Sequence, residues 1–221
     1  MTGEGEGIAR SMRAKDVLET LKLHGLVMKE RRFGRKRSHS GDFNARARSF
    51  PYKNIIIFGD DTRLSERSLA FVILHEEGHL VQKMNSLLFR AYLIMLLLIP
   101  TGLIIWRRLI GQEPQPEDFA LTALAIMFAL TAPRIFREQL MRDEVLADNY
   151  AGKCMAVFAP DLTKHDVRVI FEEVLGSIKR VTFLNWFALF LGWDLHPSIN
   201  ERVEVVFKAL VQAKRRMLLS V

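Results

Sequence analysis

Two histidines four residues apart, His75 and His79, constrain the fold of this chain more than any other feature. They belong to the sequence His-Glu-Glu-Gly-His, which has the pattern H-E-x-x-H. On a helix, residues four apart lie on the same face about one turn from each other, so both imidazoles can bind a single Zn²⁺. The carboxylate between them, Glu76, is then placed to take a proton from a water molecule on the metal. The pattern therefore predicts a helix that carries a metal site.

The residues around this motif are mostly apolar. The run Ser68–Leu74 leads directly into it, and Leu80–Val81 follow. These neighbours predict a largely buried helix, in which an uncompensated polar cluster would be costly. They disfavour the alternative, a surface helix with two solvated histidines. Ser65 is a suitable N-cap for the helix, and Gly78 lowers helix propensity enough to indicate a packing or functional reason for its presence.

The composition indicates that apolar blocks are separated from basic, soluble parts. Hydrophobic residues make up 49% of the 221 residues and charged residues 26%, with a formal net charge of +7 and a pI near 9.7. This positive charge fits an anionic membrane surface or nucleic acid. The single cysteine, Cys154, excludes an internal disulfide and fits a reducing compartment. The N-terminus is charged and rich in glycine, so no cleavable signal peptide is expected.

Residues 1–44 are predicted to form a basic N-terminal extension. Within it, residues 8–23 have the pattern of an amphipathic helix that ends near Gly25. The basic run Arg31–Arg37 is interpreted either as a solvated loop or as a segment attracted to acidic lipid headgroups. Nucleic-acid binding is unlikely on this pattern, because no aromatic platform or recognised module accompanies the basic run. The β-branched run Asn54–Phe58 is predicted to be a strand.

Two apolar blocks follow the motif, at about residues 87–110 and 119–133. Each is long enough to cross a bilayer core, which needs roughly 20 apolar residues, although the second block is at the short end of the range. A short polar segment with Pro114 and Pro116 separates them, so the pattern predicts a transmembrane hairpin at about 87–135. The alternative is a pair of buried helices in a soluble core. Lys and Arg are abundant on both sides of the hairpin and sparse in its loop, so the positive-inside rule places both termini and the metal site in the cytoplasm.

A catalytic zinc site usually has three protein ligands and a water molecule, so a third ligand is needed. After the apolar blocks, Glu144 offers an oxygen ligand, and Asp148, one helical turn later, can hydrogen-bond the second ring nitrogen of a ligand histidine. The alternative is an ordinary solvated helix face. Because a hairpin returns the chain to the side of the membrane that it left, Glu144 is expected close to His75 and His79.

The segment Leu195–Arg202 contains a last group of polar residues. Ser198 and Glu201 have the spacing of a capping box that begins a C-terminal helix. This places His196 just before the helix and Arg202 near its first turn. Taken alone, the segment is an ordinary surface cap. The preceding apolar stretch, residues 183–193, is either a segment that dips into a membrane or part of a core.

Three segments together resemble the integral-membrane zinc metallopeptidases of the HtpX and CAAX prenyl endopeptidase type. That family carries H-E-x-x-H, then E-x-x-x-D with Ala before the Asp, then a late His-Pro followed by Arg. In this chain the three stand as HEEGH at 75–79, EVLAD at 144–148 and HPSINER at 196–202. The resemblance covers roughly residues 45–210. Full members have additional N-terminal membrane spans, where this chain has its short basic N-terminus.

The resemblance implies a gluzincin-type centre with one Zn²⁺ per chain. It assigns roles to polar residues of all three segments: zinc ligands at His75, His79 and Glu144, a base at Glu76, support of a ligand at Asp148, and substrate binding or oxyanion stabilisation at His196 and Arg202.

These inferences predict a mainly α chain with a small β element: a zincin-like metallopeptidase domain with a transmembrane helical hairpin inserted between the H-E-x-x-H and E-x-x-A-D helices. The domain is expected at residues 45–221. The leading hypothesis is a multi-pass zinc endopeptidase of the cell membrane that cuts membrane-associated or misfolded proteins at the cytoplasmic face. Its expected partners are protein or peptide substrates and the lipid bilayer. The alternatives are a regulatory, metalloprotease-like protein whose basic N-terminus binds a partner or DNA, and a non-catalytic zinc scaffold, which the presence of Glu76 disfavours.

Overall fold

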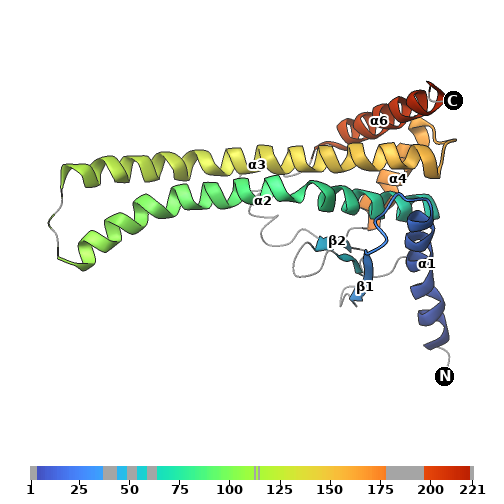
Figure 1. The fold of residues 1–221 in the computed structure, drawn as a ribbon, viewed down its shortest axis with the longest axis horizontal. Helices are drawn as coiled ribbons and strands as arrows, with labels where there is room; N and C mark the ends of the chain where they lie inside the picture. Colours follow the sequence, from blue (N-terminus) through green and yellow to red (C-terminus); the bar gives the residue numbers. More distant parts are fainter. Residues whose placement is uncertain are drawn as a thin grey trace. The chain divides into compact units, whose positions relative to one another are not determined.

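The computed structural model is mainly helical, with one small sheet (Figure 1). It describes residues 4–36, 44–48, 54–58, 64–111, 113, 115–177 and 197–219. The elements in chain order are α1 (Glu4–Leu23), β1 (Arg32–Lys36), β2 (Asn44–Arg48), β3 (Asn54–Phe58), α2 (Glu66–Leu109), α3 (Pro116–Phe158), α4 (Lys164–Ser177) and α6 (Ile199–Leu219).

The strand expected from the β-branched run is β3, and it forms the centre of a three-stranded sheet. The strand order is β1-β3-β2, with β1 parallel and β2 antiparallel to β3. Arg32 is in register with Asn54 at one end of the parallel pair, and Lys36 with Phe58 at the other. β1 belongs to the N-terminal extension predicted at residues 1–44, whereas β2 lies almost entirely after it, so the sheet joins the extension to the part of the chain that carries the H-E-x-x-H motif.

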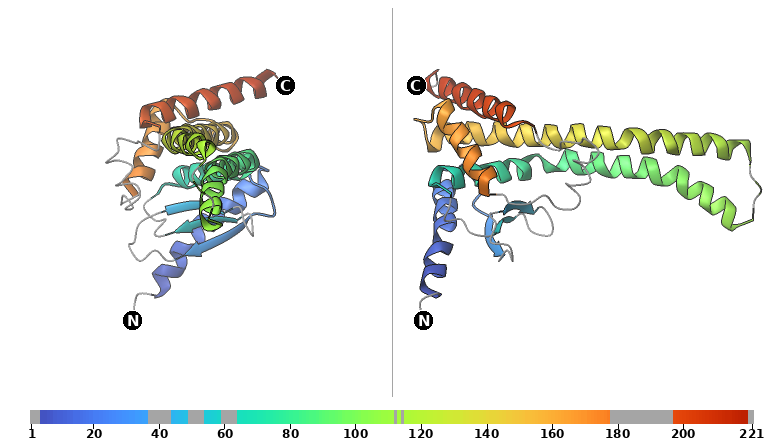
Figure 2. Two further views of the ribbon diagram at one scale, coloured as in Figure 1. Left: turned by 90° about the vertical axis from the view of Figure 1, so that its left-hand side faces the viewer. Right: turned by 180° about the vertical axis from the view of Figure 1, so that it is seen from behind.

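The chain divides into two compact units, of which the larger contains residues 1–81 and 143–221. Its core is built from apolar faces of α1, the first part of α2, the last part of α3, α4 and α6. Figure 2 shows α4 and α6 beside each other, in agreement with their direct contact. The largest fully buried apolar side chains are Phe171, Leu18, Leu21, Leu64, Leu69, Ile73, Leu74, Met155, Leu210 and Val167. The apolar run before the motif is therefore buried, as its sequence indicates.

The N-terminus of α2 is fixed by polar contacts with α4. The Ser65 hydroxyl accepts a hydrogen bond from the Ser68 backbone N–H at 3.2 Å, so Ser65 is the N-cap that its sequence position predicts. Glu173 of α4 accepts hydrogen bonds from the Ser65 and Ser68 hydroxyls at 2.8 and 2.5 Å. These bonds lower the pKa of Glu173 although its partial burial acts in the opposite direction. The start of α2, the helix that carries His75 and His79, is thus held at one defined position on α4.

The predicted transmembrane hairpin at about 87–135 is wrong. Among the residues that the structure describes, no helix combines the length and the apolar character that crossing a membrane requires. The physical reason is the spacing of charged residues. Arg90 and Arg107 enclose about 16 uncharged residues, and Asp118 and Arg134 enclose about 15, or roughly 24 and 22 Å of helix against about 30 Å of hydrocarbon.

The smaller unit contains residues 82–142 and has its own polar junction. Asp118, near the start of α3, accepts a hydrogen bond from Arg107 at 3.0 Å and one from the Gln115 backbone N–H at 3.2 Å. The bond from Gln115 contributes most to lowering the pKa of Asp118, and the charges of Arg107 and Arg108 add to it. These contacts close the turn between the end of α2 and the beginning of α3.

Candidate metal centre

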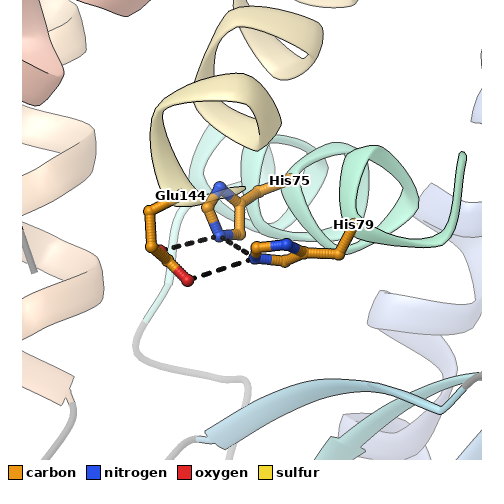
Figure 3. A group of neighbouring side chains, drawn as sticks. All are labelled: His75, His79 and Glu144. Atoms are coloured by element: carbon orange, nitrogen blue, oxygen red, sulfur yellow. Dashed lines mark hydrogen bonds and ion pairs between the residues drawn. The ribbon is translucent and has the colours of Figure 1, made fainter. Parts of the chain in front are cut away.

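Three side chains with suitable metal ligands converge in the larger unit: His75 and His79 from α2, and Glu144 from α3 (Figure 3). The Nε2 atoms of the two histidines are 3.1 Å apart. Glu144 Oε2 lies 3.4 Å from Nε2 of His75, and Oε1 lies 3.2 Å from Nε2 of His79. The structure therefore brings together the residues that the sequence analysis selected as a ligand set, although 65 residues separate His79 from Glu144.

The dimensions of this group fit a tetrahedral zinc ion. With ligands at about 2.0–2.1 Å, two corners of a tetrahedron around Zn²⁺ are about 3.3 Å apart. The distance between the two Nε2 atoms, 3.1 Å, is close to that value. Each Nε2 atom also lies 3.2–3.4 Å from one of the two oxygens of Glu144, and one ligand atom from each of the three residues lies within 4.8 Å of the others. Two imidazole nitrogens and one carboxylate occupy three corners, and a catalytic zinc site keeps the fourth for water or substrate. The donor set is also one that suits zinc chemically.

A close contact between helices places Glu144 beside the histidines. A Cβ atom added to Gly78 of α2 would meet the Ala147 Cα at 3.0 Å, its carbonyl oxygen at 3.1 Å and the Tyr150 Cβ at 3.1 Å. Ala147 is fully buried, three residues after Glu144 on α3. The small side chains at these two positions allow the helices to approach closely. The glycine in the motif and the alanine before Asp148 thus have one physical explanation.

Asp148 orients one of the candidate ligands. Its side chain is fully buried, and its Oδ1 accepts a hydrogen bond from Nδ1 of His75 at 2.9 Å. A histidine that donates through Nδ1 presents the lone pair of Nε2, the atom that faces His79 and Glu144. Burial alone lowers the pKa of His75, but hydrogen bonds and charges of Asp148 and Glu144 outweigh it and raise the pKa to about 10. A metal that binds here has to displace a proton from His75.

Arg202 lies behind Asp148. Its Nε and Nη2 atoms donate to the two oxygens of Asp148 at 2.7 and 2.8 Å, and Nη2 lies 3.6 Å from Glu144 Oε2. Its guanidinium also lies over the Phe171 ring, 4.9 Å from the ring centre. Burial raises the pKa of Asp148, but the bonds from Arg202 and His75 more than compensate and lower it. A chain of polar contacts therefore runs from Arg202 through Asp148 to His75.

The capping box predicted before Arg202 is present. The Ser198 backbone N–H donates to Glu201 at 2.9 Å, and the Glu201 N–H donates to the Ser198 hydroxyl at 3.3 Å. α6 begins at Ile199, so Arg202 projects from its first turn. His196 and the apolar stretch 183–193 lie outside the described residues. Glu76 follows His75 on α2 and is partly exposed. The catalytic roles assigned to Glu76, His196 and Arg202 stay predictions.

The sequence analysis missed one contact of the motif, a buried ion pair between Glu77 and Arg31. Arg31 donates to Glu77 through Nε at 2.6 Å and through Nη2 at 2.9 Å. The two side chains are only 3% and 1% exposed. In H-E-x-x-H the third position has no fixed residue, so nothing in the motif itself marks Glu77. Its only signal is a charged residue within an otherwise apolar helix, which in a buried position requires a partner.

We expect Gly78→Val to weaken the metal site. Its side chain would force α2 away from Ala147 and draw Glu144 away from the histidines. Zinc affinity, measured by competition with a chromogenic chelator, should fall by at least tenfold. Gly102→Val is the matched control, because Gly102 also lies in α2 but has nothing within 4 Å of an added Cβ. Equal zinc affinity in both variants would show that the close contact does not position Glu144.

Comparisons with known proteins give little further guidance. No protein-family model matches the chain, and no curated protein matches it. Among solved structures, the chain is similar to the crystal structure of S. mikatae Ste24p, with 16% sequence identity and a TM-score of 0.47. The aligned region covers 88% of this chain and 49% of that one, so the chain spans about half the length of Ste24p. A likeness this distant does not establish a shared fold, and it decides nothing about activity.

Proposed function

We propose that this chain is a zinc-dependent endopeptidase. The observation that carries the proposal is the convergence of His75, His79 and Glu144, one ligand atom from each of which lies within 4.8 Å of the others. Among the described residues these are the three that could hold a metal ion, and a catalytic zinc site has three protein ligands and a water molecule. The adjacent Glu76 adds a carboxylate that does not belong to this set. A structural zinc site is usually closed by four protein ligands, so a set of three within the described part of the chain, beside a carboxylate, favours catalysis.

Each residue then has a defined task in peptide hydrolysis. His75, His79 and Glu144 hold the ion, which when bound supplies a Lewis acid that polarises the scissile carbonyl and makes water more acidic. Glu76 accepts a proton from the attacking water and returns it to the amine that leaves. Asp148 keeps His75 in the tautomer that presents Nε2.

Arg202 is assigned a positioning role in this proposal. Its two shortest polar contacts are to Asp148, which orients the candidate ligand His75. A longer contact is to Glu144, which is itself a candidate ligand. A guanidinium held in this way neutralises part of the negative charge of the two carboxylates. It also fixes α6 to the ligand helix α3. The oxyanion role implied by the family resemblance is replaced here by support of the ligands.

The burial of the site favours extended or unfolded protein segments as substrates. The side chains of His75, His79 and Glu144 are 11%, 18% and 18% exposed. A folded protein surface reaches such atoms poorly, whereas an extended peptide can present its backbone carbonyl to them. The membrane-spanning part of the sequence-based hypothesis is not retained.

The proposal predicts chelator-sensitive digestion of an unfolded protein. Purified full-length protein loaded with zinc should cut β-casein at internal bonds, and the fragments can be identified by mass spectrometry. Removal of zinc with 1,10-phenanthroline should abolish the cleavage, because the Lewis acid is lost. Addition of zinc after removal of the chelator should restore it. The proposal would be contradicted if the protein still cut β-casein when metal analysis had shown that it contained no zinc.

A further inference from the structure

A second site is suggested by a cavity on the surface of the larger unit, between α1 and the segment that leads into β1. It is a wide, open depression with a volume of about 730 Å³. Charged side chains line it throughout: Lys15, Glu19, Lys22, Lys29, Glu30, Arg31 and Arg32. The zinc ligands are not among these residues, so the cavity is distinct from the metal centre.

The second half of α1 has apolar and charged side chains on different faces, and this separation explains why charges gather here. Val17, Leu18 and Leu21 are buried in the core. Lys15, Glu19 and Lys22 recur at helical spacing on a different face, which lines the cavity. The other lining residues are Lys29 to Arg32, just before and at the start of β1. Two segments of the chain therefore bring their positive charges to one place.

Arg31 is the fixed element of this cavity. It is 3% exposed, and its bidentate contact with Glu77 holds the guanidinium in one orientation. A guanidinium carries five N–H donors, and the two bonds to Glu77 use one on Nε and one on Nη2. Because Glu77 balances the charge of Arg31, the buried pair is neutral as a whole.

The remaining charges leave a positive excess. Lys15, Lys22, Lys29 and Arg32 contribute four positive charges, and Glu19 and Glu30 contribute two negative ones, which gives a net charge of +2. Lys22 forms an ion pair with Glu19 at 2.9 Å, so part of its charge is already balanced. The other three basic side chains have exposed positions, from which they can turn toward a ligand.

We propose that this cavity binds a phosphate group carried by a larger molecule. A phosphate monoester has a charge of about −1.5 to −2 at neutral pH, which matches the excess in the cavity. Arginine recognises phosphate through paired N–H donors, and lysine binds it as a mobile point charge, so the two residue types act together. The volume exceeds what a phosphate alone would fill, so the group that bears the phosphate also has space in the cavity.

Titration calorimetry with inorganic phosphate tests this site on the full-length protein. At matched ionic strength, phosphate should bind saturably and chloride should not. The double variant Lys15→Ala, Arg32→Ala should weaken phosphate binding at least tenfold. The control Lys153→Ala, Lys208→Ala removes the same charge from exposed positions elsewhere in the larger unit, and it should bind phosphate like the wild type. Arg31 is left in place, because its loss would leave Glu77 buried without its partner.

Two further arms distinguish the sources of the phosphate and exclude the metal centre. Phosphatidylcholine vesicles with and without phosphatidylinositol phosphate show whether the phosphate is a lipid headgroup. Binding to the phosphoinositide vesicles that the double variant loses would assign a lipid ligand, and binding of inorganic phosphate alone would assign a soluble one. The proposal is overturned if neither probe binds, if the control loses binding equally, or if phosphate binding disappears in His79→Ala while the double variant retains it.

Discussion

Glu76→Gln should retain zinc and lose peptidase activity by several orders of magnitude. Glutamine has nearly the same size as glutamate, so α2 and its two histidines should keep their positions. It cannot accept a proton from the attacking water, however, and a lost general base alone costs about 10²–10⁴ in rate. The expected result is a zinc content equal to that of the wild type, measured by atomic emission, with kcat on casein peptides reduced at least a thousandfold.

The matched control for this experiment is Glu172→Gln, the same change at an exposed position of α4. It should leave both zinc content and kcat unchanged. If Glu76→Gln loses its zinc together with its activity, Glu76 holds the metal site together and is not the base. If the variant keeps full activity, another group accepts the proton and the proposed mechanism is wrong.

Asp148→Asn should have the largest effect on stability. Asp148 is fully buried and accepts hydrogen bonds from Arg202 and His75, and the substitution leaves the Arg202 charge without its partner. Breaking a buried ion pair costs about 3–5 kcal/mol. Zinc affinity should fall about 10–100-fold, because the asparagine no longer fixes His75 as strongly. Denaturant unfolding of the zinc-free protein measures the first effect, and competition with a chelator measures the second.

A second aspartate provides the control. Asp161 also pairs with an arginine, Arg67, at 2.6 Å, but their side chains are 65% and 45% exposed. Exposed ion pairs contribute about 0–1 kcal/mol, so Asp161→Asn should change stability little and zinc affinity not at all. Equal destabilisation by the two substitutions would mean that the buried Asp148–Arg202 pair contributes no more to the free energy of unfolding than the exposed Asp161–Arg67 pair.

The parts of the site that follow local rules could be predicted from the sequence. The pairing of His75 with His79 follows from helical spacing, and the capping box of Ser198 and Glu201 follows from the i, i+3 pattern at a helix start. Glu144 was selected as the third ligand for a reason that turned out to be wrong. It reaches the histidines through the contact of Gly78 with Ala147, and a return through a membrane is not required.

Contacts between distant residues could not be predicted. Arg31 and Glu77 are 46 residues apart, and neither position carries a pattern that names its partner. Arg202 and Asp148 are 54 residues apart, and the family resemblance assigned Arg202 to the substrate or the oxyanion without indicating its contact with Asp148. The transmembrane prediction failed for a different reason. The two apolar blocks were judged by their general hydrophobicity, while Arg90, Arg107 and Arg134 limit each uncharged run to less than the usual span.

Zinc content is the measurement that tests the central claim most directly. Wild-type protein purified in the presence of zinc and then dialysed should hold about one zinc ion per chain. His79→Ala and Glu144→Ala should each lose most of it, because two remaining ligands bind the ion weakly. His165→Ala, at an exposed position of α4, should keep the wild-type content. Full zinc content in both His79→Ala and Glu144→Ala would contradict the account, since the ion would then be bound elsewhere.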